Sequence, residues 1–251
     1  MDNNYTTEMN AVLKKERNKT NTLNACFCEN NKWEIGIDEA GRGPMFGRLY
    51  VAGTILPKTN FKHEIMKDSK RFSSHKKIRE VAEYIKSNAI AWTVRYIEPD
   101  IIDEINIRQA VLKLMRECCR DLVERIQLQH NYELGDVHNK LCILIDGNDF
   151  PPFTVYNQET ETLEEVESHT IEGGDNLYTC IAGASILAKV ARDDYIAELC
   201  KEYPILNELY GINKNKGYGT AEHMRGIKTH GITKWHRKSY GICKSAPQIN
   251  I

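Results

Sequence analysis

Residues 36–44 read Gly36-Ile37-Asp38-Glu39-Ala40-Gly41-Arg42-Gly43-Pro44, so two adjacent carboxylates close an apolar segment and precede a glycine-rich turn. Divalent cations such as Mg²⁺ prefer oxygen ligands, and neighbouring acids at the end of a strand can converge on one. The glycines on either side of Arg42 let backbone N–H groups and a guanidinium approach an anion. The pattern predicts a metal-dependent phosphodiesterase, although an acidic pair alone would in most cases only solvate a loop.

Four segments have the length and composition of strands. Residues 33–37, 49–56 and 89–97 are short, mostly apolar stretches. Residues 141–145 form an uninterrupted apolar run, which is typical of a strand buried on both faces. By contrast, residues 157–167 are acidic and polar, and we expect them to form a protruding loop.

Helices are expected in three places. Ser73 and Ser74 are candidate caps for a lysine-rich helix that extends towards position 87. A long helix can begin at Asp100, because apolar residues at positions 111, 115, 118, 122 and 126 form one stripe. A third helix follows the segment 173–175 and reaches about position 201.

Asp146 and Gly147 directly follow the apolar run 141–145. Ligands of open α/β sheets usually bind beyond the carboxyl ends of the strands. If the segments 33–37 and 141–145 are parallel neighbours, Asp146 therefore meets Asp38 and Glu39. An ordinary Asp-Gly turn is the alternative interpretation.

Ser185, Lys189 and Asp193 are spaced four residues apart, so they project along one edge of the third expected helix. Small residues such as Ala184 and Ala188 form its packing face. From this edge Asp193 can reach the acidic cluster. Lys189 and Asp193 also fit a simple surface ion pair.

Two further segments carry groups that suit a nucleic acid. Ser69 and Lys70, after Asp68, offer a short hydroxyl and a cation to a phosphate backbone, or form a solvated loop. Tyr218 stands between two glycines that can expose its ring for stacking, although it also fits a packed aromatic residue.

The formal net charge is −1 for 251 residues, so nucleic-acid binding would need a local basic surface. The C-terminal part supplies a candidate, consisting of Lys214, Lys216, Arg225, Lys228, Lys234, Arg237, Lys238 and Lys244 together with His223, His230 and His236.

The eight cysteines form neither a paired Cys-x-x-Cys set nor a Cys/His finger pattern, which indicates a reduced, intracellular protein. Cys118 and Cys142 fall in apolar patterns, where cysteine acts as a small hydrophobic residue. The first residues lack a long apolar stretch or a signal-peptide pattern, so we expect a cytoplasmic protein with no membrane segment.

The segments quoted above, from about residue 33 to residue 240, together resemble the type 2 ribonuclease H, or ribonuclease HII, family. The resemblance implies an α/β fold, a ribonuclease H-like mixed five-stranded sheet flanked by helices, with a small helical C-terminal appendage. We therefore expect a polar extension at 1–32, partly helical or disordered, a catalytic domain at 33–200 and a substrate-gripping segment at 201–251.

The resemblance also implies an activity and a set of site residues. The expected substrates are RNA–DNA hybrids and DNA duplexes that contain ribonucleotides, cut to leave 5′-phosphate and 3′-hydroxyl ends by a monomer. Two Mg²⁺ or Mn²⁺ ions are expected on the four acids Asp38, Glu39, Asp146 and Asp193, the last chosen over Asp194 from the match. The expected substrate-binding residues are Gly41, Arg42, Gly43, Ser69, Lys70, Ser185, Lys189 and Tyr218.

Two other classes of protein remain open from the residues alone. A DNA resolvase or integrase also uses clustered carboxylates and metal ions but cleaves an all-DNA substrate. A hybrid-binding protein without turnover is the second alternative, and the presence of all four acids argues against it.

Overall fold

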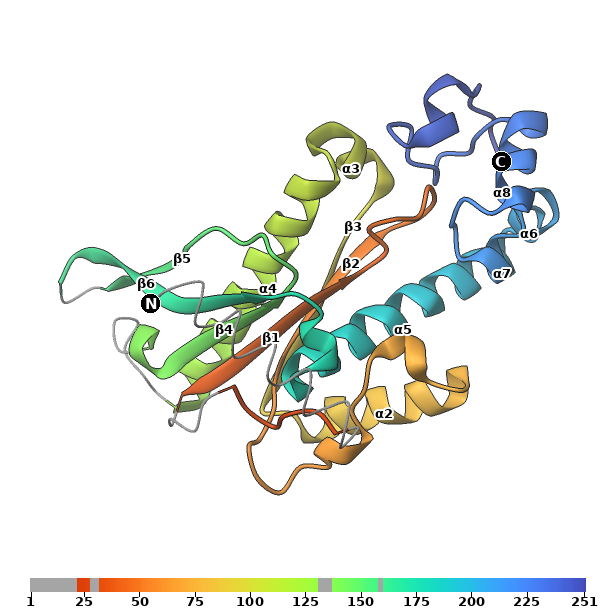
Figure 1. Cartoon of the computed structure of the whole chain (residues 1–251). Coiled ribbons are helices and arrows are strands. Elements are labelled where there is room, and N and C mark those ends of the chain that lie inside the picture. Colours follow the sequence, from red (N-terminus) through yellow and green to blue (C-terminus); the bar gives the residue numbers. More distant parts are fainter. Residues whose placement is uncertain (1–21, 28–31, 131–136, 158–159) are drawn as a thin grey trace.

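A mixed sheet of six strands forms the centre of the computed structural model, which describes residues 22–27, 32–130, 137–157 and 160–251 (Figure 1). The spatial order is β3-β2-β1-β4-β6-β5. The strands are β1 (Trp33–Ala40), β2 (Leu49–Ile55), β3 (Ala91–Ile97), β4 (Leu141–Asp146), β5 (Phe153–Asn157) and β6 (Thr162–Ile171). The fold class is the expected one, with one strand more than the five predicted.

Strands β1 and β4 are parallel neighbours, as the sequence predicted. Their register pairs Ile35 with Ile143 and Ile37 with Ile145. Asp38 and Asp146 are the next residues of the two strands, so both acids reach the same edge of the sheet. Strand β6 is also parallel to β4, and its carboxyl end therefore lies at that edge too.

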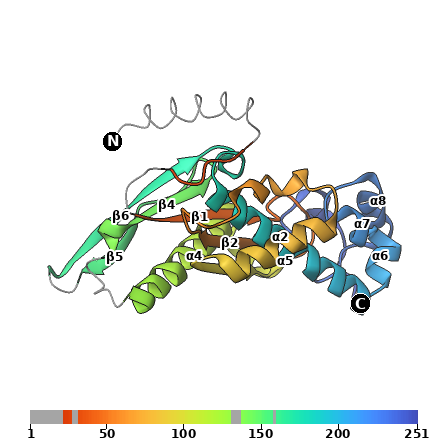
Figure 2. The same cartoon turned by 90° about the horizontal axis from the view of Figure 1, so that it is seen from below.

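The acidic segment 157–167 is not a loop, and that prediction was wrong. Most of it belongs to β6, which pairs with β4 on one side and antiparallel with β5 on the other. Its acidic side chains have polar or charged partners: His138 Nδ1 lies 2.6 Å from Glu164 Oε2, and the Lys32 ammonium lies 2.5 Å from Glu167 Oε2. The hairpin of β5 and β6 extends away from the helical C-terminal part, at the opposite end of the molecule (Figure 2).

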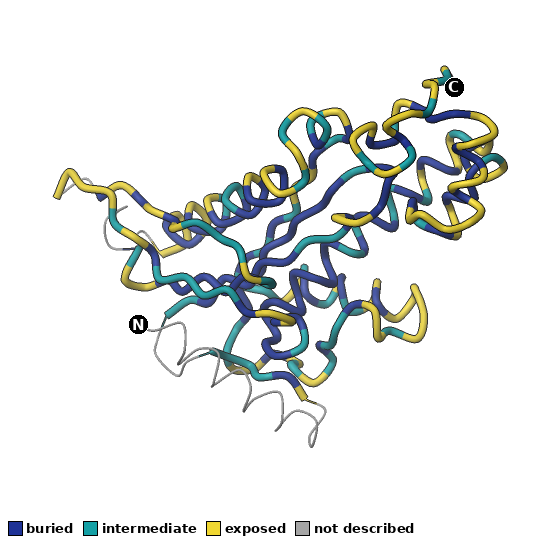
Figure 3. Tube along the Cα trace, turned by 45° about the horizontal axis from the view of Figure 1, so that its top comes forward, coloured by how far each residue is buried: buried dark blue, intermediate teal, exposed yellow. Residues whose placement is uncertain are grey.

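Two layers of helices cover the sheet. Helix α4 (Ile107–His130) packs on the face that carries Ile35 and Ile143, and the predicted apolar stripe from Val111 to Ile126 is buried there. The other face is covered by α5 (Thr179–Glu202) and α2 (His75–Asn88). Figure 3 shows the resulting contrast between buried central strands and the exposed outer hairpin.

The boundaries of the helices differ in one place from the prediction. Ser74 accepts a hydrogen bond from the Lys77 N–H and caps α2, as expected. The helix predicted from Asp100 is instead two helices, α3 (Pro99–Ile105) and α4, because Asn106 between them has a φ of 65°. A left-handed residue interrupts the right-handed helical path.

Helix α5 lies unusually close to the sheet because small residues meet at the contact. A Cβ atom built on Gly36 would lie 2.3 Å from the backbone carbonyl carbon of Cys180. Beside it, the Thr54 hydroxyl donates a hydrogen bond of 2.8 Å to the Cys180 carbonyl. This contact sets the position of α5 against β1 and β2.

The C-terminal part contains three short helices, α6 (Ile205–Tyr210), α7 (Ile212–Asn215) and α8 (Ala221–His230). They share a small core with Met45 and Phe46 from the connection between β1 and β2. The turn that follows Asp38 and Glu39 is therefore held between the sheet and the C-terminal part.

Near the start of the chain, Asn24 bridges to Tyr178 ahead of α5, and Leu23 is buried. The expected character of the extension 1–32 concerns mainly residues 1–21 and 28–31, which lie outside the described part of the chain. Cys118 and Cys142 are buried, as predicted. None of the described helices is long and apolar enough to cross a membrane.

Substituting Gly36→Ala should destabilise the fold, because the new methyl group meets the backbone of α5. We expect the free energy of unfolding to fall by about 3 kcal/mol, the upper end for overpacking. The matched control is Gly183→Ala on α5 itself, where the nearest atom is the Thr54 hydroxyl at 3.2 Å. That variant should stay within about 1 kcal/mol of the wild type, since helical alanine offsets crowding. Equal losses in chemical denaturation of the two variants would show that the close contact at Gly36 is unimportant.

Candidate active site

A cleft of about 400 Å³ opens at the carboxyl ends of β1 and β4. Eleven of the twelve predicted site residues line it, namely Asp38, Glu39, Gly41, Arg42, Gly43, Ser69, Lys70, Asp146, Ser185, Lys189 and Tyr218. The exception is Asp193, and Asp175 lines the cleft as an additional acid.

Asp193 is held on α5 by other partners. The Lys189 ammonium lies 2.7 Å from its Oδ1 atom, and His75 Nδ1 lies 3.7 Å from its Oδ2 atom. The side chain is buried and does not line the cleft. The ion pair with Lys189, the alternative drawn from the four-residue spacing, is the arrangement in the structure.

Asp175 supplies the fourth acid of the cleft. It lies in a 3₁₀ turn, Gly174–Asn176, between the end of β6 and the start of α5. The Asn176 side chain donates a hydrogen bond of 2.9 Å to its Oδ1 atom. From the sequence, this segment was predicted only to precede a helix. A signal was present, since Asp175 follows a glycine pair after a strand, but β6 had not been recognised as a strand.

Burial raises the pKa of Asp38 well above its ordinary value, and the nearby charges of Asp146 and Glu39 raise it further. The pKa values of Glu39 and Asp146 are raised mainly by burial as well. Burial, followed by the charges of Asp146 and Asp68, raises the pKa of Asp175 to about 6. Ionised together, these carboxylates repel one another, and a divalent cation between them would relieve the repulsion.

Hydrogen bonds from the backbone orient two of the acids. The Gly174 N–H donates to Asp146 Oδ1 at 2.7 Å, and the Glu39 N–H donates to Asp38 Oδ1 at 2.7 Å. Further hydrogen bonds reach Asp38 from the Ser185 side chain and Asp146 from the Asp175 backbone. An all-oxygen donor set of this kind fits Mg²⁺ or Mn²⁺.

The buried side chain of Arg237 forms hydrogen bonds to the backbone of the glycine-rich turn. Its guanidinium donates to the carbonyl oxygens of Gly41, Arg42 and Gly47 at 2.7, 3.2 and 3.0 Å. Its side chain is fully buried. The prediction that Arg237 belongs to an exposed basic surface was therefore wrong, because the guanidinium is used to position the turn.

A second buried arginine joins this turn to the Tyr218 segment. Arg192 donates to the carbonyl oxygens of Phe46 and Lys216 at 3.2 and 2.8 Å. Gly41 has a φ of +98°, and a Cβ atom there would lie 2.4 Å from Arg192 Nε. Glycine at position 41 thus allows the backbone to approach the guanidinium.

Tyr218 lines the cleft beside the glycine-rich turn. Its side chain is 49% exposed, so it is not the packed aromatic residue of the alternative interpretation. A Cβ atom on Gly43 would lie 3.5 Å from its ring. The Met45 N–H donates to the Gly217 carbonyl at 2.9 Å, which ties the two segments together. The ring and Arg42, which is also exposed, are available to a ligand.

Two histidines of the predicted basic surface are also buried, His223 and His236, with their Nε2 atoms 3.1 Å apart. Burial lowers the pKa of both, that of His236 to about 3, so neither is cationic near neutral pH. The surface that remains is made by exposed side chains, Lys214, Arg225, Lys228, His230, Lys234, Lys238 and Lys244, with half-buried Lys216.

Comparisons with known proteins agree with this geometry. The family model described as Ribonuclease HII matches residues 35–243. The ribonuclease HII of Phocaeicola vulgatus is 38% identical over 218 residues, which cover 87% of this chain and 94% of that protein. The ribonuclease HII of Flavobacterium psychrophilum is 39% identical over 223 residues, with 87% and 95% covered. The crystal structure of ribonuclease H2 from Pyrococcus horikoshii OT3 has the same fold, with a TM-score of 0.58, 21% identity, and coverage of 84% of this chain and 95% of that chain. This chain therefore belongs to the ribonuclease HII family and is an endonuclease of the hydrolase class.

Proposed function

We propose that the chain hydrolyses RNA in RNA–DNA hybrids and cuts duplex DNA at embedded ribonucleotides, leaving 5′-phosphate and 3′-hydroxyl ends. The observation that supports this specificity is the arrangement of the cleft, where buried acids lie beside the turn 41–43 and the exposed ring of Tyr218. A cation-binding cluster next to a group that inspects the sugar is what cleavage at a ribonucleotide requires. The 2′-hydroxyl is the feature that distinguishes RNA from DNA at one position.

Asp38, Glu39, Asp146 and Asp175 are the proposed ligands of two divalent ions, Mg²⁺ or Mn²⁺. Asp175 replaces Asp193 in this set because it lines the cleft, whereas Asp193 is paired with Lys189. When bound, the ions would activate water and stabilise the leaving 3′-oxygen. The chain itself supplies orientation through the Gly174 N–H on Asp146 and the Glu39 N–H on Asp38.

The substrate-binding roles follow from position in the cleft. Gly41, Arg42 and Gly43 contact the ribose 2′-hydroxyl and the neighbouring phosphate, and Tyr218 stacks on the following deoxyribose. The Arg42 guanidinium lies 3.5 Å from Glu39, so it can turn from the carboxylate to a phosphate when a cation neutralises the acids.

A second group of substrate-binding residues lies on the opposite wall. Ser69 and Ser185 share a hydrogen bond of 3.1 Å beside Asp38. Exposed Lys70 and partly buried Lys189 place cations along the same wall of the cleft, where they can follow the phosphate backbone.

In this proposal the catalytic domain and the C-terminal segment have different roles. Residues 33–200 carry the acids, and residues 201–251 supply Tyr218 and the exposed lysines that grip the duplex. One chain contains all these groups, so we propose that a monomer is active, inside the cell.

The decisive experiment compares purified full-length chain on three duplexes: an RNA–DNA hybrid, a DNA duplex with one ribonucleotide, and all-DNA of the same sequence. Cleavage of the first two, with Mg²⁺ or Mn²⁺ and a chelator control, supports the proposal. Cleavage of all-DNA would favour a resolvase-like activity. Binding of the hybrid without product under any metal condition would indicate a non-hydrolytic binding protein.

Asparagine substitutions test which four acids hold the ions. Asp38→Asn, Asp146→Asn and Asp175→Asn should each lower kcat by roughly two to three orders of magnitude, because each removes a negatively charged metal ligand. Asp193→Asn is the control on the same helix edge and should lower kcat less than about tenfold. Circular dichroism confirms folding. A severe loss in Asp193→Asn with full activity in Asp175→Asn would reverse the assignment.

Tyr218→Ala should lower kcat/KM on the duplex with one ribonucleotide by about tenfold, because aromatic stacking is worth on the order of 1–3 kcal/mol. Tyr218→Phe keeps the ring and should stay within about twofold of the wild type. Arg42→Ala should weaken selection of the ribonucleotide junction in product mapping. Unchanged junction preference in both alanine variants would reject the proposed contact with the sugar.

The cation requirement should depend on pH. Because the pKa values of the four acids are raised, part of the cluster is protonated near pH 6, and a cation must displace those protons. The Mg²⁺ concentration for half-maximal activity should therefore rise as pH falls from about 8 to about 6. Mg²⁺ titrations at several pH values measure this dependence. A half-maximal concentration that is constant over this range would contradict the buried, coupled cluster.

A further inference from the structure

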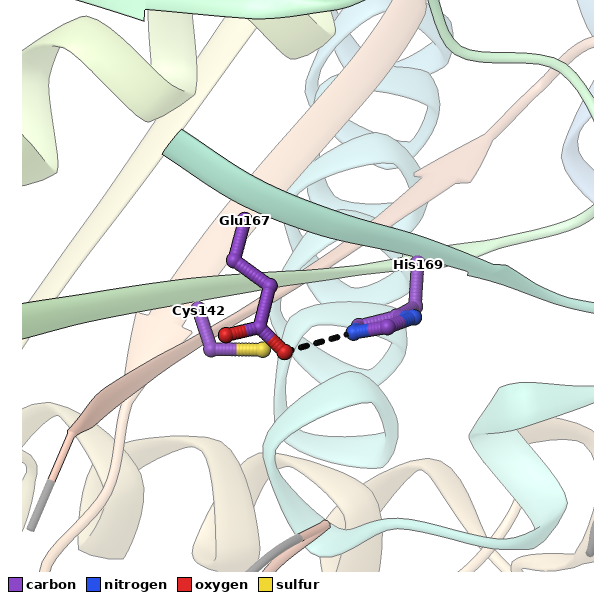
Figure 4. Close-up of side chains that lie close together, drawn as sticks. All are labelled: Cys142, Glu167 and His169. Carbon is purple, nitrogen blue, oxygen red and sulfur yellow. Dashed lines mark hydrogen bonds and ion pairs between the residues drawn. The ribbon is translucent and has the colours of Figure 1, made fainter. Parts of the chain in front are cut away.

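A second group of metal-ligating side chains lies at the other end of β4, away from the acidic cleft. Cys142, Glu167 and His169 each place a donor atom so that all three atoms lie within 4.8 Å of one another (Figure 4). Cys142 is paired with Glu167 across β4 and β6, and His169 is two residues further along β6 on the same face. Cys142 is four residues before Asp146, roughly 13 Å along the strand.

The donors of this cluster differ in kind from those of the cleft. A thiolate, an imidazole and a carboxylate are ligands typical of Zn²⁺, whereas Mg²⁺ and Mn²⁺ favour the all-oxygen set. The two sites therefore select different cations.

The geometry is close to that of a bound ion. Ligand atoms around tetrahedral Zn²⁺ are roughly 3.3–3.8 Å apart, and the three donor atoms here all lie within 4.8 Å of one another, so each separation is within about 1.5 Å of those values. His169 Nε2 and Glu167 Oε1 already face each other at 2.8 Å, where a shared proton now holds them. A metal ion can take the place of that proton.

Neighbouring groups hold two of the ligands in place. The Lys32 ammonium lies 2.5 Å from Glu167 Oε2, and the other oxygen faces His169. The ring of Phe27 packs on the His169 imidazole, with ring centroids 4.7 Å apart. Such outer contacts orient metal ligands in proteins.

An ion can reach the cluster from one side. Cys142 is fully buried, but the side chains of His169 and Glu167 are 18% and 37% exposed. A fourth coordination position would open in the direction of solvent.

We propose that Cys142, Glu167 and His169 bind one Zn²⁺ ion, with water as the fourth ligand, at a site separate from the catalytic cleft. The ion would link β4, which carries Asp146, to β6, which leads to Asp175. Its role is structural, and it is independent of the proposed hydrolytic activity.

The first test measures Zn²⁺ binding to the full-length chain by competition with a chromophoric chelator, in excess Mg²⁺ to occupy the acidic cleft. We expect one tightly bound Zn²⁺ per chain. Cys142→Ser and His169→Ala should each weaken its affinity at least about 100-fold. The control is Cys200→Ser, which removes a buried thiol of α5 and should bind like the wild type. Equal affinity in the wild type and Cys142→Ser would overturn the proposal.

The second test covers the case in which a substituted chain fails to fold. Co²⁺ bound by the folded wild-type chain should give a thiolate-to-cobalt charge-transfer band, and Asp146→Asn should retain it. Co²⁺ in the acidic cleft cannot give this band, because no sulfur lines that cleft. Absence of the band in wild-type protein that cleaves its substrate with Mg²⁺ would remove the Zn²⁺ site and leave the proposed function intact. A band without cleavage would do the reverse.

Discussion

The parallel pairing of β1 with β4 is the constraint on which the site depends. Its register makes Asp38 and Asp146 the next residues of adjacent strands, and the buried strands on either side leave no room for the acids to separate. Burial raises the pKa values of both acids, and a neighbouring carboxylate raises each further, Asp146 acting on Asp38 and Glu39 acting on Asp146. The strand pairing therefore holds the acids close together, and in the proposed site a divalent cation would relieve their repulsion.

The glycine-rich turn depends on a different kind of electrostatic contact. Arg192 and Arg237 are buried beneath it, and among their described contacts they donate to backbone carbonyl oxygens. Carbonyl oxygens satisfy the N–H groups, burial lowers the pKa of both arginines, and the nearby charges of Asp193 and Asp103 partly offset this for Arg192 and Arg237, respectively. Although burial lowers the pKa of Arg237 to about 10, the group stays protonated near neutral pH. Arg192 and Arg237 therefore fix the backbone of the turn that carries exposed Arg42.

A strand or helix could be predicted from the sequence where its hydrophobic pattern shows that it is buried. Apolar runs report burial directly, so 33–37, 141–145 and the stripe of α4 were found. Strand β6 carries no such run, and its acidic side chains contact Lys32 and His138, residues remote in sequence. Failure to recognise β6 also concealed Asp175, whose place at the edge of the sheet exists only because β6 is parallel to β4.

Asp193 does not line the cleft, for a geometric reason. Ser185 lines the cleft, but Asp193 is two turns further along α5, about 12 Å away and rotated by roughly 80° around the axis. Four-residue spacing keeps side chains on one edge only over short distances. The four-residue spacing places Lys189 next to Asp193, but the eight-residue distance from Ser185 places Asp193 outside the cleft. The cluster of Cys142, Glu167 and His169 could not be predicted from the sequence either. Its members come from two strands and follow none of the short spacings by which zinc sites are recognised.

The same two strands therefore position charge at both of their ends. At the carboxyl end, the Gly174 N–H that follows β6 binds the Asp146 side chain of β4. At the other end, Cys142 of β4 lies against Glu167 and His169 of β6. Since paired strands are stiff along their length, a link between β4 and β6 at one end limits how far they can shift at the other. The acids repel most strongly when no cation is bound, and it is then that a fixed register between these strands matters most for keeping the cleft ready to bind one.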